Sequence, residues 1–222
     1  MAEAMRATVA SLLKGIDRYN PENLPTLERY VDMQAKDNTY DLEANLAVLK
    51  LYQFNPSLYQ TGVTAMILLK ALTNLPHSDF ILCKCLIETH RLTEELVSKV
   101  LRLAHFLETA NFQQFWVSLM DDPDLLIGII GFEDSIRKFA GKYFCLYIAS
   151  TPTSKCSAKD KLRQLLGNIS DTQTSQWISK YGWTEQLDGY VFITSQDENI
   201  KTKNITEKIS FDSVAAIMAA GR

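Results

Sequence analysis

The first candidates for chemistry in this chain are two cysteines that lie close together in the sequence, Cys83 and Cys85. Two thiolates can hold one zinc ion only when both side chains point to the same place. The surrounding residues have helical spacing, which directs these two side chains to different sides of a helix. We therefore predict no metal site here and expect both cysteines to be buried as small apolar residues.

The histidines offer no better arrangement for catalysis or metal binding. His77, His90 and His105 fall in separate segments, with no second histidine or cysteine at the spacing of metal ligands. We expect them to be polar surface or capping residues. Cys145 could act as a nucleophile with a distant histidine as its base, but no protease signature flanks it. The sequence therefore predicts a protein that is not an enzyme.

The glycines give no sign of a nucleotide site. Gly128 and Gly131 stand in an apolar run without the following Gly-x-x-Gly or Gly-Lys-Ser context that holds a phosphate group. Most aromatic residues lie on helical stripes, which favours the core over ligand stacking. We expect neither a cofactor nor a bound metal.

The overall composition is that of a folded globular chain. Its 222 residues are 46% apolar and 22% charged, which suits one large domain or two small ones. A formal net charge of −3 provides no general attraction to nucleic acid or to an anionic membrane. The longest apolar run, residues 125–132, is too short to span a bilayer, and we expect no signal peptide. Four sparse cysteines are typical of reduced thiols, so we expect a cytoplasmic or nuclear protein.

Apolar residues recur at helical spacing through the first half of the chain. The segments expected to be helical are residues 5–16, 25–35, 42–54, 59–75, 79–87, 93–107 and 111–119. The third and fourth are apolar around most of their circumference, which predicts burial between neighbours. Ile16 is expected on the inner face of the first helix and Leu96 on that of the sixth. Helix pairs with short links and no fixed period are typical of an irregular α-solenoid with HEAT-like repeats.

An acidic, proline-containing stretch at residues 121–124 is the best candidate for a domain boundary. We predict a helical-repeat domain over residues 1–122, a winged-helix domain over 126–200, and a C-terminal linker and helix over 201–222. The first helix of the second domain is predicted from five residues at helical spacing, namely Ile136, Phe139, Ala140, Tyr143 and Tyr147.

Residues 157–194 predict two helices and a hairpin, the order found in a winged helix. The first helix has a stripe that ends at Gly167 and consists of Ala158, Leu162, Leu165 and Leu166. The second begins with a capping box of Ser170 and Gln173. Its inward stripe consists of Thr174, Trp177, Ile178 and Tyr181. Residues 183–187 and 190–194 then flank Asp188-Gly189, a dipeptide that favours a two-residue hairpin turn.

The outward face of that second helix disfavours DNA recognition. Between residues 171 and 181 it is mostly neutral and polar, with Lys180 as its single cation. The cations around it are Lys159, Lys161 and Arg163, and the carboxylates that offset them are Asp160, Glu185 and Asp188. We expect direct nucleic-acid binding to be weak or absent. We assign Gln173, Gln176 and Lys180 to a candidate protein interface instead.

The last residues provide a second candidate interface. Residues 197–208 are polar and charged, and Val214, Ile217 and Met218 then recur at helical spacing. A helix this short is marginal alone and needs a surface for its apolar stripe. That surface could be a helix of a partner protein or this chain's own winged helix.

Several stretches are specific beyond their helical pattern. The run YDLEANLAVLKLYQFNP at residues 40–56 is too long and specific to arise from helical composition alone. Further stretches of this kind are residues 15–24, 27–31, 68–76, 131–135, 179–183, 203–204 and 211–214. Together they resemble the subunit k family of eukaryotic translation initiation factor three. The departures concentrate at residues 88–122 and 141–163.

This resemblance implies a non-catalytic scaffold subunit with a helical-repeat domain followed by a winged helix. Subunits of the proteasome lid and of the signalosome share that arrangement. The resemblance also implies side-by-side assembly through the winged helices, pairing with subunit l, and association with the small ribosomal subunit through protein contacts. Two alternatives remain open, a winged-helix nucleic-acid-binding regulator and a lid or signalosome subunit of the same fold.

Overall fold

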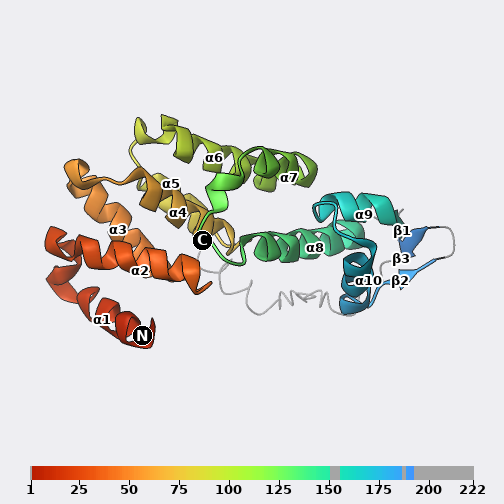
Figure 1. Cartoon of the computed structure of the whole chain (residues 1–222), viewed down its shortest axis with the longest axis horizontal. Coiled ribbons are helices and arrows are strands. Elements are labelled where there is room, and N and C mark those ends of the chain that lie inside the picture. Colours follow the sequence, from red (N-terminus) through yellow and green to blue (C-terminus); the bar gives the residue numbers. More distant parts are fainter. Residues whose placement is uncertain (1, 151–155, 187–188, 193–222) are drawn as a thin grey trace, which may run out of the picture.

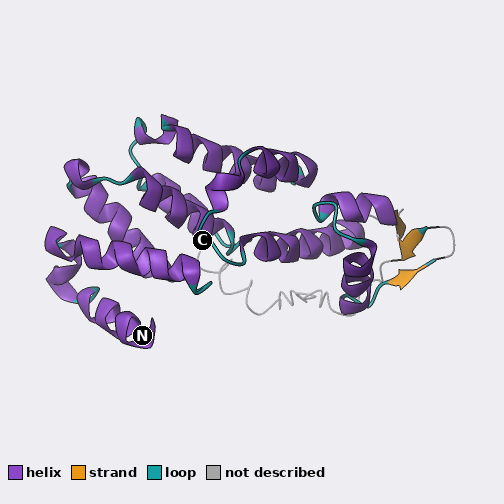
Figure 2. Ribbon diagram, viewed as in Figure 1, coloured by secondary structure: helices purple, strands orange, loops and turns teal. Residues whose placement is uncertain are grey.

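The computed structural model describes residues 2–150, 156–186 and 189–192, and it is mainly helical (Figure 1, Figure 2). The first seven α-helices are α1 (Ala2–Leu12), α2 (Leu24–Lys36), α3 (Leu42–Phe54), α4 (Thr61–Leu72), α5 (Asp79–Cys85), α6 (Glu95–Glu108) and α7 (Phe112–Asp121). The later elements are α8 (Phe132–Ser150), β1 (Cys156–Ala158), α9 (Lys159–Leu165), α10 (Asp171–Lys180), β2 (Thr184–Glu185) and β3 (Tyr190–Phe192). Short 3-10 turns are η1 (Gly15–Tyr19), η2 (Pro21–Asn23), η3 (Pro56–Leu58), η4 (Arg91–Thr93) and η5 (Pro123–Leu126).

Helices α1 to α7 form one array, and α8 leads from it toward α9, α10 and the strands (Figure 1). Helix α4 lies at the centre of the array, where it packs against α2, α3, α5 and α6. Both α3 and α4 bury side chains around most of their circumference, which confirms the prediction made for these two segments. Burial of a continuous apolar surface between neighbouring helices is the main source of stability in such an array.

The bounds of α3 are those predicted, because each end has a local signal. The Asp41 side chain accepts a hydrogen bond from the backbone N–H of Ala44 at 3.2 Å and so caps the first turn. At the other end, Asn55 precedes Pro56, and the residue before a proline avoids the α region.

Two residues assigned to inner helix faces are exposed. Ile16 is 87% exposed because α1 ends at Leu12 and Gly15, at φ +76°, turns the chain into η1, where the α-helical period no longer applies. Leu96 is exposed and Val97 is buried in its place. The inner stripe of α6 therefore begins at Val97 and continues at Val100, one position later than the predicted first residue, Leu96.

A buried polar contact fixes how α2 lies on α3. The Gln34 amide donates to the Asn45 side-chain oxygen at 3.0 Å, and the backbone N–H of Asp41 donates to the Gln34 oxygen at 2.7 Å. Both amide side chains are at most 1% exposed. Because a shift of one helix along the other would leave these buried groups without partners, the pair specifies the register of α2 against α3.

The region predicted as a winged helix contains one strand more than the sequence indicated. The sheet is antiparallel and has the order β1-β3-β2. Thr184 pairs with Phe192 and Glu185 with Val191, which confirms that the two predicted segments pair. The Gln186 N–H donates to the Tyr190 carbonyl oxygen at 2.8 Å, so three residues separate the paired positions and not the two predicted for a turn at Asp188-Gly189. Leu187 and Asp188 lie outside the described residues. Ala158 pairs with Tyr190, so it belongs to β1 and not to the helix assigned to it. A three-residue strand is too short to show an alternating pattern in the sequence.

Helix α8 confirms the predicted first helix of this region, with Ile136 and Ala140 buried. Tyr143 is more exposed than expected, although its ring lies 5.8 Å from that of Phe112 on α7. The Tyr147 side chain and the whole predicted C-terminal helix, including Val214, Ile217 and Met218, lie outside the described residues. Among the helices that are described, none is long and apolar enough to cross a membrane.

Candidate functional site

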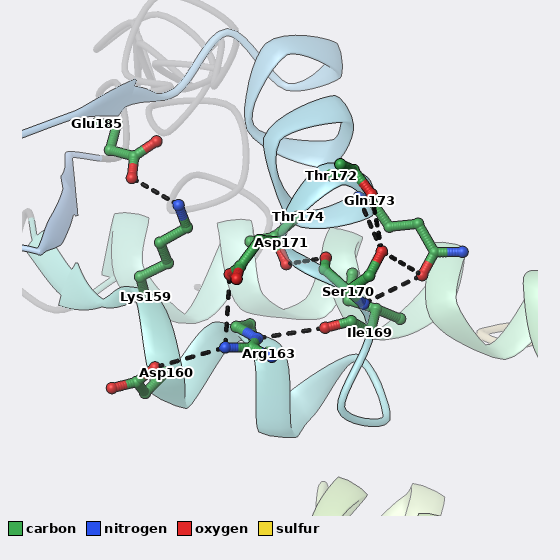
Figure 3. A network of polar contacts seen from close by, with 10 residues as sticks. All are labelled: Lys159, Asp160, Arg163, Ile169, Ser170, Asp171, Thr172, Gln173, Thr174 and Glu185. Carbon is green, nitrogen blue, oxygen red and sulfur yellow. Dashed lines mark hydrogen bonds and ion pairs between the residues drawn. The ribbon is translucent and has the colours of Figure 1, made fainter.

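The candidate interface helix, α10, begins with the predicted capping box. The Gln173 backbone N–H donates to the Ser170 hydroxyl at 3.3 Å, and the Ser170 backbone N–H donates to the Gln173 side-chain oxygen at 3.2 Å (Figure 3). Thr174 adds a hydrogen bond from its hydroxyl to the Ser170 carbonyl oxygen at 2.9 Å. The capping box therefore gives partners to two backbone N–H groups at the start of α10, those of Ser170 and Gln173.

The buried residues of α10 are Thr174 and Ile178, and beside them aromatic rings stack from α10 to the residue before β2. Trp177 stacks on Tyr181 with ring centroids 5.5 Å apart, and Tyr181 stacks on Trp183 at 5.2 Å. Trp183 is buried, whereas Trp177 and Tyr181 are half-buried. A Cβ added to Gly141 of α8 would lie 3.2 Å from the Trp177 ring, so the stack packs tightly against α8. Trp177 anchors α10 as predicted, but it does so at the edge of the core.

All three residues assigned to the interface on α10 are exposed. The Gln173 side chain is held by the capping box, and the Lys180 ammonium lies 5.0 Å from the centroid of the Trp177 ring. Gln176 lies between them on the outward face. The structure thus places Gln173, Gln176 and Lys180 on one polar surface of a well-anchored helix.

Two of the three cations predicted around α10, Lys159 and Arg163, are paired with carboxylates. Lys159 lies 2.6 Å from a carboxylate oxygen of Glu185. Arg163 lies 3.4 Å from Asp171 and 4.0 Å from Asp160, and its Nε donates to the carbonyl oxygen of Ile169 at 3.2 Å (Figure 3). The predicted offset by Asp160 and Glu185 is confirmed, whereas Asp188 lies outside the described residues. The sequence did not indicate that Asp171 also binds Arg163.

The residues considered for chemistry lie apart from one another. His77, His90 and His105 are exposed, and His90 Nδ1 lies 3.4 Å from Glu88. Across the described part of the chain, no three His, Cys, Asp or Glu side chains are grouped closely enough to hold a metal ion. Cys83 is buried, but Cys85 is exposed, so the expectation of burial is wrong for the second cysteine. An α-helix that buries position 83 turns position 85 outward. The side chain of Cys145 lies outside the described residues.

Gly131 has a packing role that the sequence did not reveal. Its φ is +75°, and a Cβ at this position would collide with the side chain of Asn38. The Asn38 oxygen accepts a hydrogen bond at 3.3 Å from Lys70, a fully buried lysine of α4. Burial lowers the pKa of the Lys70 ammonium. These three residues join the segment before α8 to the array, at a glycine whose sequence context gave no sign of a phosphate site.

Comparison with known proteins assigns the chain to a family. A family model described as CSN8/PSMD8/EIF3K family matches residues 58–204, from η3 to beyond β3. The chain is 58% identical over 222 residues to human "Eukaryotic translation initiation factor 3 subunit K", covering 100% of this chain and 99% of that protein. The protein of the same title from Nematostella vectensis is 47% identical over 222 residues and is covered completely. The chain belongs to the CSN8/PSMD8/EIF3K family.

Within the CSN8/PSMD8/EIF3K family, the polar face of α10 and the sheet lie inside the matched segment, whereas α1 to α3 precede it. The full-length relatives extend the similarity over those first helices as well. The Danio rerio protein titled "Eukaryotic translation initiation factor 3 subunit K" is 56% identical over 220 residues, which is 99% of this chain and 98% of that protein. The resemblance seen in residues 15–56 therefore continues a similarity along the whole chain.

Proposed function

We propose that this protein is a non-catalytic scaffold subunit of eukaryotic translation initiation factor 3 and acts in translation initiation. The observation that carries the proposal is the 58% identity, over the whole chain, to a protein titled as subunit K of that factor. In this proposal the array is an irregular solenoid of HEAT-like repeats over residues 1–122. Residues 126–200 form a winged helix, and residues 201–222 supply a linker and a C-terminal helix.

The proposed contacts to partner subunits are made by two surfaces. One is the exposed face of α10 with Gln173, Gln176 and Lys180, whose mostly neutral polar character suits a protein partner. The other is the C-terminal stripe of Val214, Ile217 and Met218, which needs an apolar surface to bury. We assign subunit l as the main partner and expect association with the small ribosomal subunit to run through protein contacts. The proposed location is the cytoplasm, with the nucleus as a second compartment.

The alternative of a winged-helix nucleic-acid-binding regulator is disfavoured by charge. Lys159 and Arg163 are bound to carboxylates, and Lys180 lies over an aromatic ring. Phosphate contacts supply most of the affinity of non-specific DNA binding, so a surface on which Lys159 and Arg163 are already bound to carboxylates offers fewer of those contacts. A lid or signalosome subunit would belong to the same family. The full-length relatives, however, are titled as subunit K of initiation factor 3.

The test is affinity purification of the chain, tagged and expressed at its natural level, followed by identification of the proteins recovered. We expect the other subunits of initiation factor 3, with subunit l retained at the highest salt. Recovery of the lid or signalosome subunits instead would refute the proposal.

The C-terminal contact can be tested in the same experiment. Replacing Ile217→Asp together with Met218→Asp should reduce recovery of partner subunits while the circular dichroism spectrum stays that of the parent. A folded variant that recovers all partners undiminished would show that the C-terminal stripe is not a docking element.

A further inference from the structure

The segment that joins α7 to α8 (Figure 1) carries two exposed isoleucines. Ile127 is 73% exposed and Ile130 is 59% exposed. The other aliphatic residues of the segment, Leu125, Leu126 and Ile129, are half-buried and pack against the core. A single exposed apolar side chain is ordinary on a protein surface. Two of them within residues 127–130, on a segment whose other aliphatic side chains are used for packing, indicate a surface that another molecule covers.

The first of these isoleucines lies at the tip of a defined turn. The Ile129 N–H donates to the Leu126 carbonyl oxygen at 3.0 Å and closes a turn over residues 126–129. Ile127 has φ −57° and ψ 121°, and Gly128 has φ +84°. These are the dihedral angles of a type II turn, whose second central position favours glycine. Ile127 therefore occupies the first central position, with its side chain exposed and its backbone fixed.

The residues after the turn attach it to the array. The Ile130 N–H donates at 3.0 Å to the carbonyl oxygen of Ala35, in α2. Gly131 follows directly and packs against the side chain of Asn38. Both isoleucines are thus presented by an ordered backbone. A surface that is already ordered loses less conformational entropy when a partner binds, which favours association.

Carboxylates border the two isoleucines on both sides. Residues 121–136 contain no lysine or arginine, and their five carboxylates are Asp121, Asp122, Asp124, Glu133 and Asp134. In the described part of the chain, Lys99 and Arg102 form ion pairs with Asp122. Arg137 forms ion pairs with Glu133 and Asp134. Asp121 and Asp124 are exposed and have no ion pair among the described residues. Five carboxylates therefore face three cations, and the surface is negative even with its ion pairs counted.

This charge selects the class of partner. A negative surface repels the phosphates of RNA and of anionic lipids, so neither a nucleic acid nor a membrane suits the two isoleucines. It attracts lysine and arginine side chains, and complementary charge steers partners together and fixes their register. An apolar centre with a charged border is the usual composition of a protein–protein contact.

We propose that Ile127 and Ile130 form a docking surface that fits an apolar depression of a partner protein whose border carries lysine or arginine. The surface lies between the array and α8 and is separate from the α10 face and from the C-terminal stripe. It adds a contact surface to those of the proposed function and does not depend on which complex the chain joins.

The test places a photoreactive apolar residue, p-benzoylphenylalanine, at position 127 in place of Ile127. The full chain is expressed in cells, irradiated and purified under denaturing conditions, and its crosslinked segments are mapped by mass spectrometry. We expect one discrete segment of another protein, with apolar residues and with lysine or arginine close by. The control has the same photoreactive residue in place of Ile81, which is 56% exposed on α5 and should not capture that segment.

A second change on the surface tests the apolar contact. Ile130→Asp should lower the crosslink yield at position 127 about fivefold or more, because it places a charge in the apolar centre of the contact. Ile81→Asp is the matched control and should leave that yield unchanged. Both positions are exposed, so both variants should keep the circular dichroism spectrum of the parent.

A charge reversal tests the border. Asp121→Lys combined with Asp124→Lys should lower the yield at position 127 about fivefold or more, because it replaces attraction by repulsion. Glu22→Lys combined with Glu108→Lys changes the net charge equally, at two exposed carboxylates outside residues 121–136, and should not lower the yield.

Four results would overturn the proposal. They are capture of RNA or of an acidic segment, capture of this chain's own residues, capture at position 127 no greater than at position 81, and full capture in both the Ile130→Asp and the charge-reversed variants. The identity of the captured protein is a separate result. A chain that recovers the subunits of initiation factor 3 but captures nothing at position 127 would refute this surface and leave the proposed function standing.

Discussion

The indole N–H of Trp116 donates a 2.9 Å hydrogen bond to the carbonyl oxygen of Leu165, which ties α7 to the end of α9. Arg137 of α8 donates from Nε to the Leu166 carbonyl oxygen at 3.1 Å, and its guanidinium lies 5.0 Å from the centroid of the Trp116 ring. The last carbonyl groups of a helix have no partner within it. Here α7 and α8 supply those partners, so the α9–α10 region is fixed to the array.

The close packing of Gly167 against the Trp116 ring predicts that Gly167→Ala is destabilising. Gly167 has φ +86°, and a Cβ there would lie 2.8 Å from the Trp116 ring. We expect a loss of about 2–3 kcal/mol in the free energy of unfolding, measured by urea denaturation. Gly62→Ala is the matched control, because Gly62 lies in α4 with open space at its Cβ and should change stability by less than about 1 kcal/mol. Equal losses in the two variants would contradict this assignment.

The buried Gln34–Asn45 pair predicts an asymmetry between single and double changes. Asn45→Ala leaves the Gln34 amide buried without its partner and should cost about 1–3 kcal/mol in unfolding free energy. Replacing both residues by leucine removes both side-chain amides and leaves only the backbone N–H of Asp41 without its acceptor, so the double variant should lose no more stability than the single one. Gln53→Ala, on the exposed side of the same helix, should stay within about 0.5 kcal/mol. If the double variant had a lower free energy of unfolding than Asn45→Ala, the pair would stabilise the fold by more than the hydrogen bonds of its own groups.

Trp177→Ala should cost about 2 kcal/mol in unfolding free energy, below the roughly 3–5 kcal/mol typical of a fully buried tryptophan, because Trp177 is half-buried. Trp177→Phe should recover most of the loss because a phenyl ring can still stack on Tyr181. Both values follow from denaturant titration. If Ala and Phe variants were equally stable, the stack would have no energetic role.

The two neighbouring cysteines should react at very different rates. Burial, with a smaller effect from Asp79, raises the pKa of the Cys83 thiol to about 12, whereas Cys85 is exposed. At pH 8 iodoacetamide should modify Cys85 within minutes and leave Cys83 intact until denaturant is added, as read by peptide mass mapping. Because the folded-state pKa of Cys83 is raised, its contribution to stability is present below pH ~8.5 and is lost as the pH rises toward 12. Rapid labelling of Cys83 in the native protein would contradict its burial.

Local signals in the sequence were sufficient where a helix had both an apolar stripe and defined ends. α3 has the predicted bounds and ends at Asn55-Pro56, and α10 begins at the predicted Ser170–Gln173 capping box. The polar face of α10 could be predicted for the same reason, since outward positions follow once the helix phase is known.

Features that depend on contacts between distant segments could not be predicted. Strand β1 exists because it pairs with β3, more than thirty residues later, and its own three residues carry no strand pattern. The pairing of Arg163 with Asp171 requires the turn between α9 and α10 to bring the two side chains together. Such features follow from tertiary packing, which the spacing of residues along one segment does not reveal.

The paired cations next to α10 predict that DNA affinity is held low by specific carboxylates. The parent protein should show no submicromolar binding to mixed-sequence duplex DNA at near-physiological salt. Asp171→Asn combined with Glu185→Gln removes the carboxylates nearest Arg163 and Lys159. Since each phosphate contact contributes about 0.9 to the slope of log K against log salt, two freed cations should steepen that slope by about 2.

The matched control is Glu108→Gln combined with Asp124→Asn, which changes the net charge equally at two exposed carboxylates outside the α10 surface. If net charge alone governed binding, both double variants would gain the same affinity, because the long-range field depends on total charge. If local pairing governs it, the gain and the steeper salt slope appear only in the Asp171→Asn and Glu185→Gln variant, as measured by fluorescence anisotropy over a salt series. Tight, strongly salt-dependent binding by the parent would instead show that this surface offers phosphate contacts without any change, and the regulator alternative would then regain support.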